Sequence, residues 1–207
     1  MARHRGEKTG RDLVRTRVAH LAARLMAVDG VADFATAKQK AARQAGLGED
    51  DPLPDNQEIE EALRAYQDLF LQGEHPAQLR WLRGIAVEAM RLLADFDPHL
   101  TGSVLSGTAG PDSDVNIQVF ADDCKEIELL LINRGIRYRP EQRSVRRGVR
   151  KVAVPVLRIE RDGAEIAIAV LAPNDLRIQR RGADGRPLER ARLAQVEAMI
   201  AEALPGA

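Results

Sequence analysis

Cysteine is almost absent from the 207-residue sequence, which contains only Cys124. A single cysteine excludes an intramolecular disulfide and a cluster of cysteine ligands around a metal ion. The sequence also lacks an uncharged apolar run long enough to cross a membrane, and it lacks a signal-peptide pattern. From these absences we expect a soluble, cytoplasmic protein.

The motifs of several common enzyme classes are missing as well. The sequence contains no Walker loop, no His-Glu-x-x-His zinc motif and no nucleophile elbow. It carries no net charge, because 31 Lys and Arg residues balance 31 Asp and Glu residues. The overall charge therefore does not indicate a nucleic-acid partner.

The first half of the chain is predicted to be helical. Apolar residues recur at steps of three and four over residues 14–25 and 59–70, and a shorter alanine-rich helix is expected at 34–45. A further helix, with Pro76 in its first turn, leads towards the second half. We assign residues 1–73 to a helical N-terminal region. It could be an acceptor-binding module, a homodimer interface or a structural brace.

The second half alternates strands with helices. Strands are expected at residues 99–102, 114–120, 136–139, 152–159 and 164–171, with helices after Asp122 and after Pro187. Pro155, inside one of these strands, indicates a sheet edge or a bulge. The prediction for the whole chain is an α+β fold, with a mixed sheet flanked by helices in residues 74–207.

The most informative stretch is GSVLSGTAGPDSDVN, residues 102–116. A Gly102-Ser103 turn is followed by Asp114, which opens an alternating strand. Asp114, Asn116 and Gln118 share one face of that strand, because successive side chains point to opposite faces. A carboxylate and an amide are thus expected at the mouth of a Gly/Ser-rich loop, and this arrangement suits a metal-bound phosphate.

This stretch resembles the nucleotidyltransferase superfamily, in particular its minimal members, which share a palm-like sheet with DNA polymerase beta. The family pattern is an apolar residue, Gly-Ser, a short gap and then Asp-apolar-Asp/Glu-apolar. The matching residues are Leu100, Gly102, Ser103, Ser113, Asp114, Val115, Asn116 and Ile117. The likeness spans roughly residues 98–171, and it implies a nucleotidyltransferase-like domain over residues 74–207.

The resemblance also implies roles for the residues of this stretch. Gly102, Ser103, Ser106 and Gly107 would bind the phosphates of a nucleoside triphosphate, since backbone amides of a Gly/Ser turn donate to phosphate oxygens. Metal ligation would come from Asp114 and Asn116, with Mg²⁺ offsetting charge as the α-phosphate is attacked. The implied reaction is transfer of a nucleotidyl group to an unidentified acceptor hydroxyl.

A third carboxylate is predicted on a later strand. Asp162-Gly163 indicates a hairpin turn, and the strand after it places Glu165 on one face with small alanine neighbours. By the resemblance, Asp114 and Glu165 are the catalytic candidates. Structural explanations stay open: Glu165 as a polar residue near a strand start, Asp114 as a capping or turn carboxylate, and Gly102-Ser103 as an ordinary turn.

The sequence departs from the family pattern at one essential position. Asn116 stands where active members carry a second carboxylate, and an amide oxygen ligates a hard cation without contributing charge. Val104, Leu105 and Ser106 occupy loop positions where small members often carry arginine. The alternative function is therefore a catalytically inactive relative that binds a nucleotide, or a protein or RNA partner, in a regulatory role.

Positive charge is concentrated between two of the predicted strands. The densest run comprises Arg143, Arg146, Arg147, Arg150 and Lys151. Such a run is typical of a solvated loop. Its place in the presumed catalytic half nevertheless makes its four arginines the candidates for contacting a phosphate or RNA.

Overall fold

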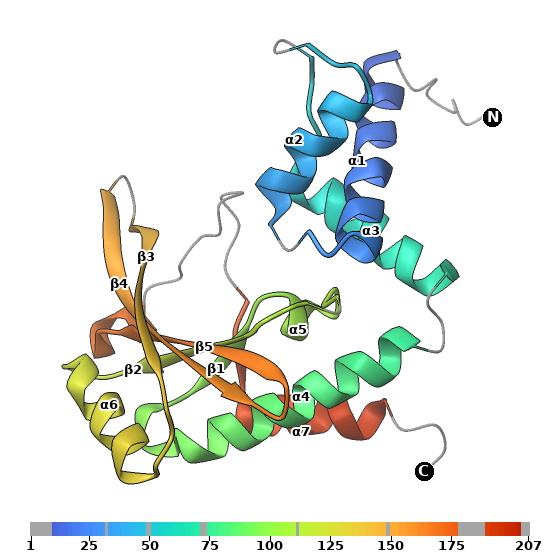
Figure 1. Ribbon diagram of the computed structural model, residues 1–207. Coiled ribbons are helices and arrows are strands. Elements are labelled where there is room, and N and C mark those ends of the chain that lie inside the picture. The colour runs from blue at the N-terminus through green and yellow to red at the C-terminus, as the bar shows by residue number, and fades with distance from the viewer. Residues whose placement is uncertain are drawn as a thin grey trace, which may run out of the picture. The chain divides into compact units, whose positions relative to one another are not determined.

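The computed structural model describes residues 10–31, 33–48, 51–70, 74–110, 112–147, 150–177 and 189–203. The chain divides into two compact units, residues 1–72 and residues 73–207. The first unit contains three helices, α1 (Gly10–Val28), α2 (Phe34–Gln44) and α3 (Asn56–Phe70) (Figure 1). All three predicted helices of this region are thus confirmed.

Small residues form much of the core of the helical unit. Ala22, Ala41 and the larger Ile59 and Leu63 are almost fully buried, and the alanines allow the helices to approach closely. The start of α2 is fixed by Asp33, whose carboxylate accepts a hydrogen bond of 2.8 Å from the Thr36 amide. These local signals explain why this part of the fold could be predicted from the sequence.

The second unit is built on a six-stranded mixed sheet with the order β3-β4-β5-β2-β1-β6. The pairing of β2 with β5 is parallel, whereas every other pair is antiparallel. The predicted α+β class is therefore confirmed. The strands are β1 (His99–Thr101), β2 (Val115–Phe120), β3 (Arg139–Arg147), β4 (Arg150–Arg161), β5 (Ala164–Leu171) and β6 (Ala191–Arg192).

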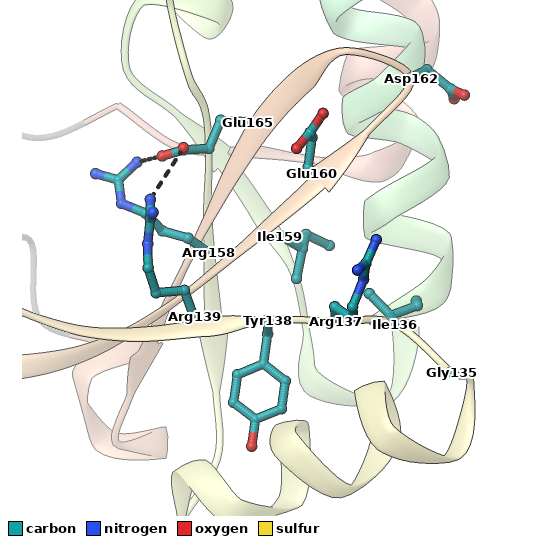
Figure 2. A pocket seen from close by; sticks show the side chains of 10 residues that line it. All are labelled: Gly135, Ile136, Arg137, Tyr138, Arg139, Arg158, Ile159, Glu160, Asp162 and Glu165. Atoms are coloured by element: carbon teal, nitrogen blue, oxygen red, sulfur yellow. Dashed lines mark hydrogen bonds and ion pairs between the residues drawn. The ribbon is translucent and has the colours of Figure 1, made fainter.

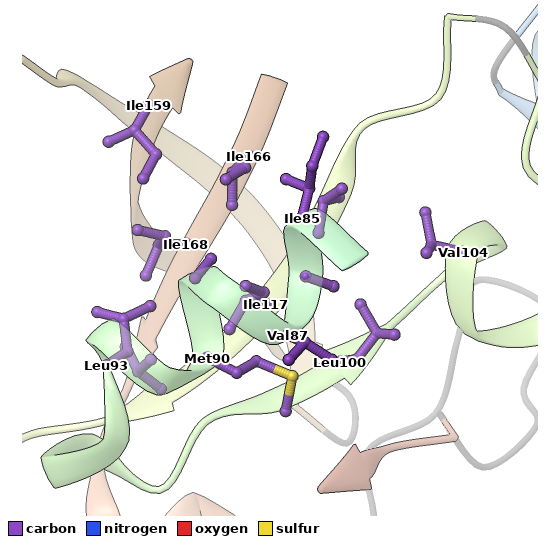
Figure 3. Packing of buried hydrophobic residues seen from close by; sticks show 14 of the residues in the cluster. Ile85, Val87, Met90, Leu93, Leu100, Val104, Ile117, Ile159, Ile166 and Ile168 are labelled. Carbon is purple, nitrogen blue, oxygen red and sulfur yellow. The ribbon is translucent and has the colours of Figure 1, made fainter. Parts of the chain in front are cut away.

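Helices cover one face of this sheet. Figure 1 shows α4 (Glu74–Leu92) and α7 (Leu193–Glu202) side by side beneath the strands, with α6 (Cys124–Asn133) near one end. The buried side chains of Met90 and Leu93 pack here against Ile117, Ile166 and Ile168 (Figure 3). Because side chains alternate along a strand, Asn116, Gln118 and Glu165 belong to the opposite face, called the open face below.

The structure corrects the predicted strand at residues 136–139. Strand β3 begins at Arg139 and continues to Arg147, so the basic run lies in the paired strands of a hairpin rather than in a loop. Antiparallel pairing with β4 satisfies the backbone groups on one side of this polar segment, which is the outer strand of the sheet. Local composition does not reveal such a partner, which is why the strand was placed too early.

Three other elements differ from expectation. The predicted loop after Gly102 contains a short helix, α5 (Ser103–Ser106), and α7 begins at Leu193 after the unpredicted strand β6. The expected helix start at Pro187 lies outside the described residues.

Pro155 lies in the first half of β4, which pairs with β3 alone, since pairing with β5 begins at Val156. This proline therefore occupies an edge with respect to β5, as predicted.

Gly102 provides a test of this local geometry. Its backbone angles are φ 76° and ψ −156°, a region that only glycine adopts readily. We expect Gly102→Ala to lower the free energy of unfolding by about 1–3 kcal/mol, measured by chemical denaturation. The fluorescence of Trp81, the sole tryptophan, reports on this unit because Trp81 lies in α4.

The matched control is Gly84→Ala, in the interior of α4. No atom lies within 4 Å of the Cβ that this change would add, and alanine favours helix over glycine. We expect Gly84→Ala to raise the free energy of unfolding by about 0.5–1 kcal/mol. Effects of the same sign at both glycines would show that the Gly102 backbone is not strained.

Candidate functional site

The site is assembled on the open face by the register of three neighbouring strands. Asn116 of β2 lies opposite Ala167 of β5, and Ala167 lies opposite Arg158 of β4. Asp114 directly precedes β2, and Glu165 is the second residue of β5. The parallel pairing thus brings Asp114 and Glu165, fifty-one residues apart in the sequence, to the same end of adjacent strands.

Arg158 connects these two carboxylates. Its Nη1 atom donates a hydrogen bond of 2.9 Å to Oδ2 of Asp114 and a second hydrogen bond to Oε1 of Glu165. Its Nε atom donates to a third carboxylate, that of Glu141 on β3. The Arg158 side chain is only 17% exposed, so these ion pairs are partly shielded from water.

Two further arginines reach the same place from β3. Arg139 donates a hydrogen bond of 3.4 Å to Glu165, and Figure 2 shows Arg139 and Arg158 converging on its carboxylate. Arg143 donates a hydrogen bond of 3.2 Å to Oδ1 of Asn116, whose Nδ2 atom donates to the backbone oxygen of Asp114 at 3.2 Å. The amide of Asn116 is thereby held between a guanidinium group and the backbone.

The ion pairs shift the pKa values of two of these groups. The hydrogen bond from Arg158 lowers the pKa of Glu141 below its usual range, and the positive charge of Arg158 adds to this effect. The pKa of Arg158 is raised above its usual value, first by the hydrogen bond to Glu141 and then by Asp114 and Glu165. Arg158 is therefore a permanent cation of the site.

The Gly102-Ser103 turn lies directly beside this cluster. A Cβ atom at Gly102 would be 3.6 Å from Nδ2 of Asn116, so the turn packs against the amide that follows Asp114 by two residues. Arg83 of α4 holds the other end of α5 by donating to the backbone oxygens of Val104 and Leu105, at 3.2 and 3.3 Å. Burial of Arg83 lowers its pKa.

The remaining predicted phosphate contacts lie further from the cluster. The hydroxyl of Ser106 is 2.9 Å from the hydroxyl of Thr108, and Gly107 ends α5 with φ 85°. Gly107 faces Leu79 and Arg83 of α4 rather than the carboxylates. The structure thus brings together Gly102, Asp114, Asn116, Glu165 and Arg143, whereas the contacts of Ser106 and Gly107 are with Thr108 and α4.

The basic hairpin is described in part. Arg146, Arg147 and Arg150 lie in the paired strands at the end of the hairpin, and their side chains lie outside the described residues. Strand β4 pairs only with β3 from Arg150 to Pro155, so a two-stranded ribbon continues past the end of β5. Among the side chains of the run that the structure describes, that of Arg143 contacts a predicted site residue, Asn116.

An open pocket of about 740 Å³ borders the cluster. It lies where β3 begins, between the segment after α6 and the end of β4 (Figure 2). Arg139, Arg158 and Glu165 form one side, and Tyr138 and Glu160 also line it. The Gly102-Ser103 turn is not part of its lining.

The donor set does not fit a divalent cation as it is arranged. Of the two predicted ligands, Asp114 is bonded to Arg158, and the oxygen of Asn116 accepts from Arg143. The catalytic candidate Glu165 is bonded to Arg158 as well. A Mg²⁺ ion, which binds oxygen ligands at about 2.0–2.1 Å, would compete with these guanidinium groups. Among the described residues, no group of three or more His, Cys, Asp or Glu side chains could hold a metal ion.

Sequence reasoning missed the residue at the centre of the site. Arg158 carries no motif, and its contacts depend on the register between β4 and β5, which the sequence does not display. The available signal was its place on a predicted strand next to the turn that leads to Glu165. Arg139, Glu141 and Arg83 were missed for the same reason, because each acts through a partner distant in the sequence.

No family model and no curated protein matches the sequence. The solved structures that are similar to it include two RNA terminal uridylyltransferases. A cytoplasmic RNA terminal U-transferase shares 24% identity over 60% of this chain and 31% of that chain, with a TM-score of 0.29. Cid1, an RNA terminal uridylyl transferase, shares 20% identity over 60% of this chain and 33% of that chain, with a TM-score of 0.30.

The chain spans about a third of the length of these two proteins. At such TM-scores the likeness carries no argument about this chain. What supports a nucleotidyltransferase-like fold is the order of the chain's own elements, with the Gly-Ser turn, the Asp114 strand and the Glu165 strand placed as the resemblance implies. In the described part of the chain, no helix is long and apolar enough to span a membrane.

The lowered pKa of Glu141 predicts a pH-dependent contribution to stability. Because its folded pKa lies below its unfolded pKa of about 4.3, the Arg158–Glu141 pair stabilises the fold above that pH. The contribution is lost as the pH falls through the folded pKa. We therefore expect Glu141→Gln to be less stable than the native protein at neutral pH, and the difference to shrink on acidification.

The measurement is the free energy of unfolding of both proteins at several pH values from neutral to strongly acidic. A difference between them that stayed constant over this range would contradict the prediction, because it would show that the charge of Glu141 is not what stabilises the fold.

Proposed function

We propose that this protein is a nucleotidyltransferase-like protein that binds a nucleoside triphosphate on the open face of its sheet, as a non-catalytic member of that superfamily. The observation that carries the proposal is the set of bonds from Arg158 to both candidate catalytic carboxylates, Asp114 and Glu165. Asn116 supports it, because the position of the second family acid contributes no charge.

The groups suited to binding phosphate are the arginines and the turn. Within the part of the chain that the structure describes, Arg139 and Arg143 each donate one side-chain hydrogen bond, of 3.4 and 3.2 Å, which leaves further donors for a ligand. Guanidinium groups bind phosphate in a bidentate manner, and the turn at Gly102 adds backbone donors.

A second candidate function is nucleotidyl transfer itself, with Mg²⁺, to an acceptor hydroxyl. The observation in its favour is the placement of Asp114 and Glu165 on adjacent parallel strands beside the Gly-Ser turn. This function would require Arg158 to leave both carboxylates. The acceptor would remain to be found among small molecules, proteins and RNA.

Calorimetric titration with a non-hydrolysable ATP analogue tests the first function. We expect binding that does not require Mg²⁺ and that weakens about tenfold in Arg143→Gln, since a charge-assisted hydrogen bond is lost. Arg91→Gln is the control with the same change in charge, because Arg91 pairs with Glu197 on α7. It should bind as the native protein does.

Two other outcomes would be informative. Binding that requires Mg²⁺ and is lost in Asp114→Ala would favour the second candidate. If the native protein bound neither this analogue nor its GTP, CTP and UTP counterparts, nucleotide binding would be wrong, and a protein or RNA partner would be the better proposal.

RNA binding through the hairpin is tested by its dependence on salt. Arg143, Arg146, Arg147 and Arg150 lie on the two-stranded ribbon, and each phosphate contact releases counterions from the nucleic acid. If they bind RNA, the affinity for a single-stranded RNA should fall steeply as the salt concentration rises, measured by fluorescence anisotropy. Weak binding that is insensitive to salt would remove RNA from the list of partners.

A further inference from the structure

The reach of Arg158 across the sheet depends on the small residue between it and its partner. Arg158, Ala167 and Asn116 form one row over the three strands β4, β5 and β2. Neighbouring strands lie about 4.8 Å apart, so a side chain on β4 must cross about 10 Å to reach β2. The methyl group of Ala167 leaves this path open, and arginine is long enough to follow it to Asp114.

The position of Nη1 of Arg158 determines whether a metal ion can bind between the two carboxylates. Nη1 of Arg158 bonds to one carboxylate oxygen from each of two adjacent strands, Asp114 and Glu165. A cation that joined these two carboxylates would compete with Nη1 for the space between them. Because the guanidinium group stays protonated at any ordinary pH, a metal ion at this point would meet a permanent positive charge.

Glu141 fixes this guanidinium group from its other side. It accepts from Nε of Arg158, so three carboxylates surround a side chain that is 17% exposed. Withdrawal of Arg158 would leave these carboxylates without their common partner. Arg158 is therefore a fixed structural component of the site.

Asn116 and Arg143 complement this arrangement. The amide is neutral, its oxygen accepts from Arg143, and its Nδ2 atom donates to the backbone of Asp114. Where the family pattern places a second acid for metal binding, this chain has a group already oriented by an arginine. The negative charges of three carboxylates are then balanced by the positive charges of three arginines. These residues are Asp114, Glu141, Glu165, Arg139, Arg143 and Arg158.

We propose that Arg158 is a built-in cation that takes the place of a divalent metal between Asp114 and Glu165. The open face then binds the phosphate groups of its ligand through guanidinium groups, without a metal bridge. The phosphate part of this inference rests on the proposed function. The exclusion of metal does not, because it concerns the side chains of the chain alone.

The test is a titration of the full chain with Mn²⁺, with no nucleotide present, in which free Mn²⁺ is measured by electron paramagnetic resonance. We expect no binding that depends on Asp114 in the native protein. Arg158→Gln removes the guanidinium group that the two carboxylates share, so this variant should bind one Mn²⁺ ion at least about tenfold more tightly than the native protein. The gain should disappear in Arg158→Gln combined with Asp114→Asn.

Arg161→Gln is the matched control. It makes the same change in charge on the same strand, but Arg161 pairs with Glu88 of α4, so Mn²⁺ binding should stay as in the native protein. Circular dichroism shows whether each variant is folded. Because no nucleotide is present, a failure to bind nucleotide in the separate calorimetric titration would not alter this result.

Asn116→Asp keeps the test decisive if Arg158→Gln does not fold. This variant restores the acid of the family pattern while Arg158 stays in place, so we expect it to bind no more Mn²⁺ than the native protein. Tight Mn²⁺ binding by the native protein or by Asn116→Asp, abolished by Asp114→Asn, would overturn the proposal. A folded Arg158→Gln variant that gains no Mn²⁺ would overturn it as well.

Discussion

The parallel pairing of β2 with β5 is the constraint on which the candidate site depends. It aligns Val115 with Ile166, so the carboxylates just before those residues, Asp114 and Glu165, come to the same end of the sheet. The segment that connects the two strands includes α6 and the β3–β4 hairpin. That hairpin returns alongside β5, which places Arg158 within reach of both carboxylates.

The same pairing gives the two faces of the sheet different roles: one face packs into the core, and the other carries the charged groups of the site. One face supplies Ile117, Ile166 and Ile168 to the core beneath α4, which fixes the strands in register. A shift by one residue would expose these side chains and bury the polar ones. The apolar face therefore holds the charged groups of the opposite face in position.

Much of the fold could be predicted from the sequence, because its signals are local. Helical periodicity marked α1 to α4 and α6, and the alternation after Asp114 marked the site strand. The centre of the site could not be predicted, since the role of Arg158 arises from the register of three strands. The extent of β3 was missed for a related reason: its partner β4, rather than its own residues, makes that segment a strand.

Ala167 lies between Arg158 and Asn116 in one row across the sheet, so the pattern that defines the site joins residues of three different strands. A larger side chain in this row would block the passage from Arg158 to Asp114. Homologous chains with the same design should therefore vary together at the three positions of this row: a long cation, a small residue and a neutral amide. Coordinated change at these positions would distinguish such chains from metal-binding relatives even where the Gly-Ser motif is identical.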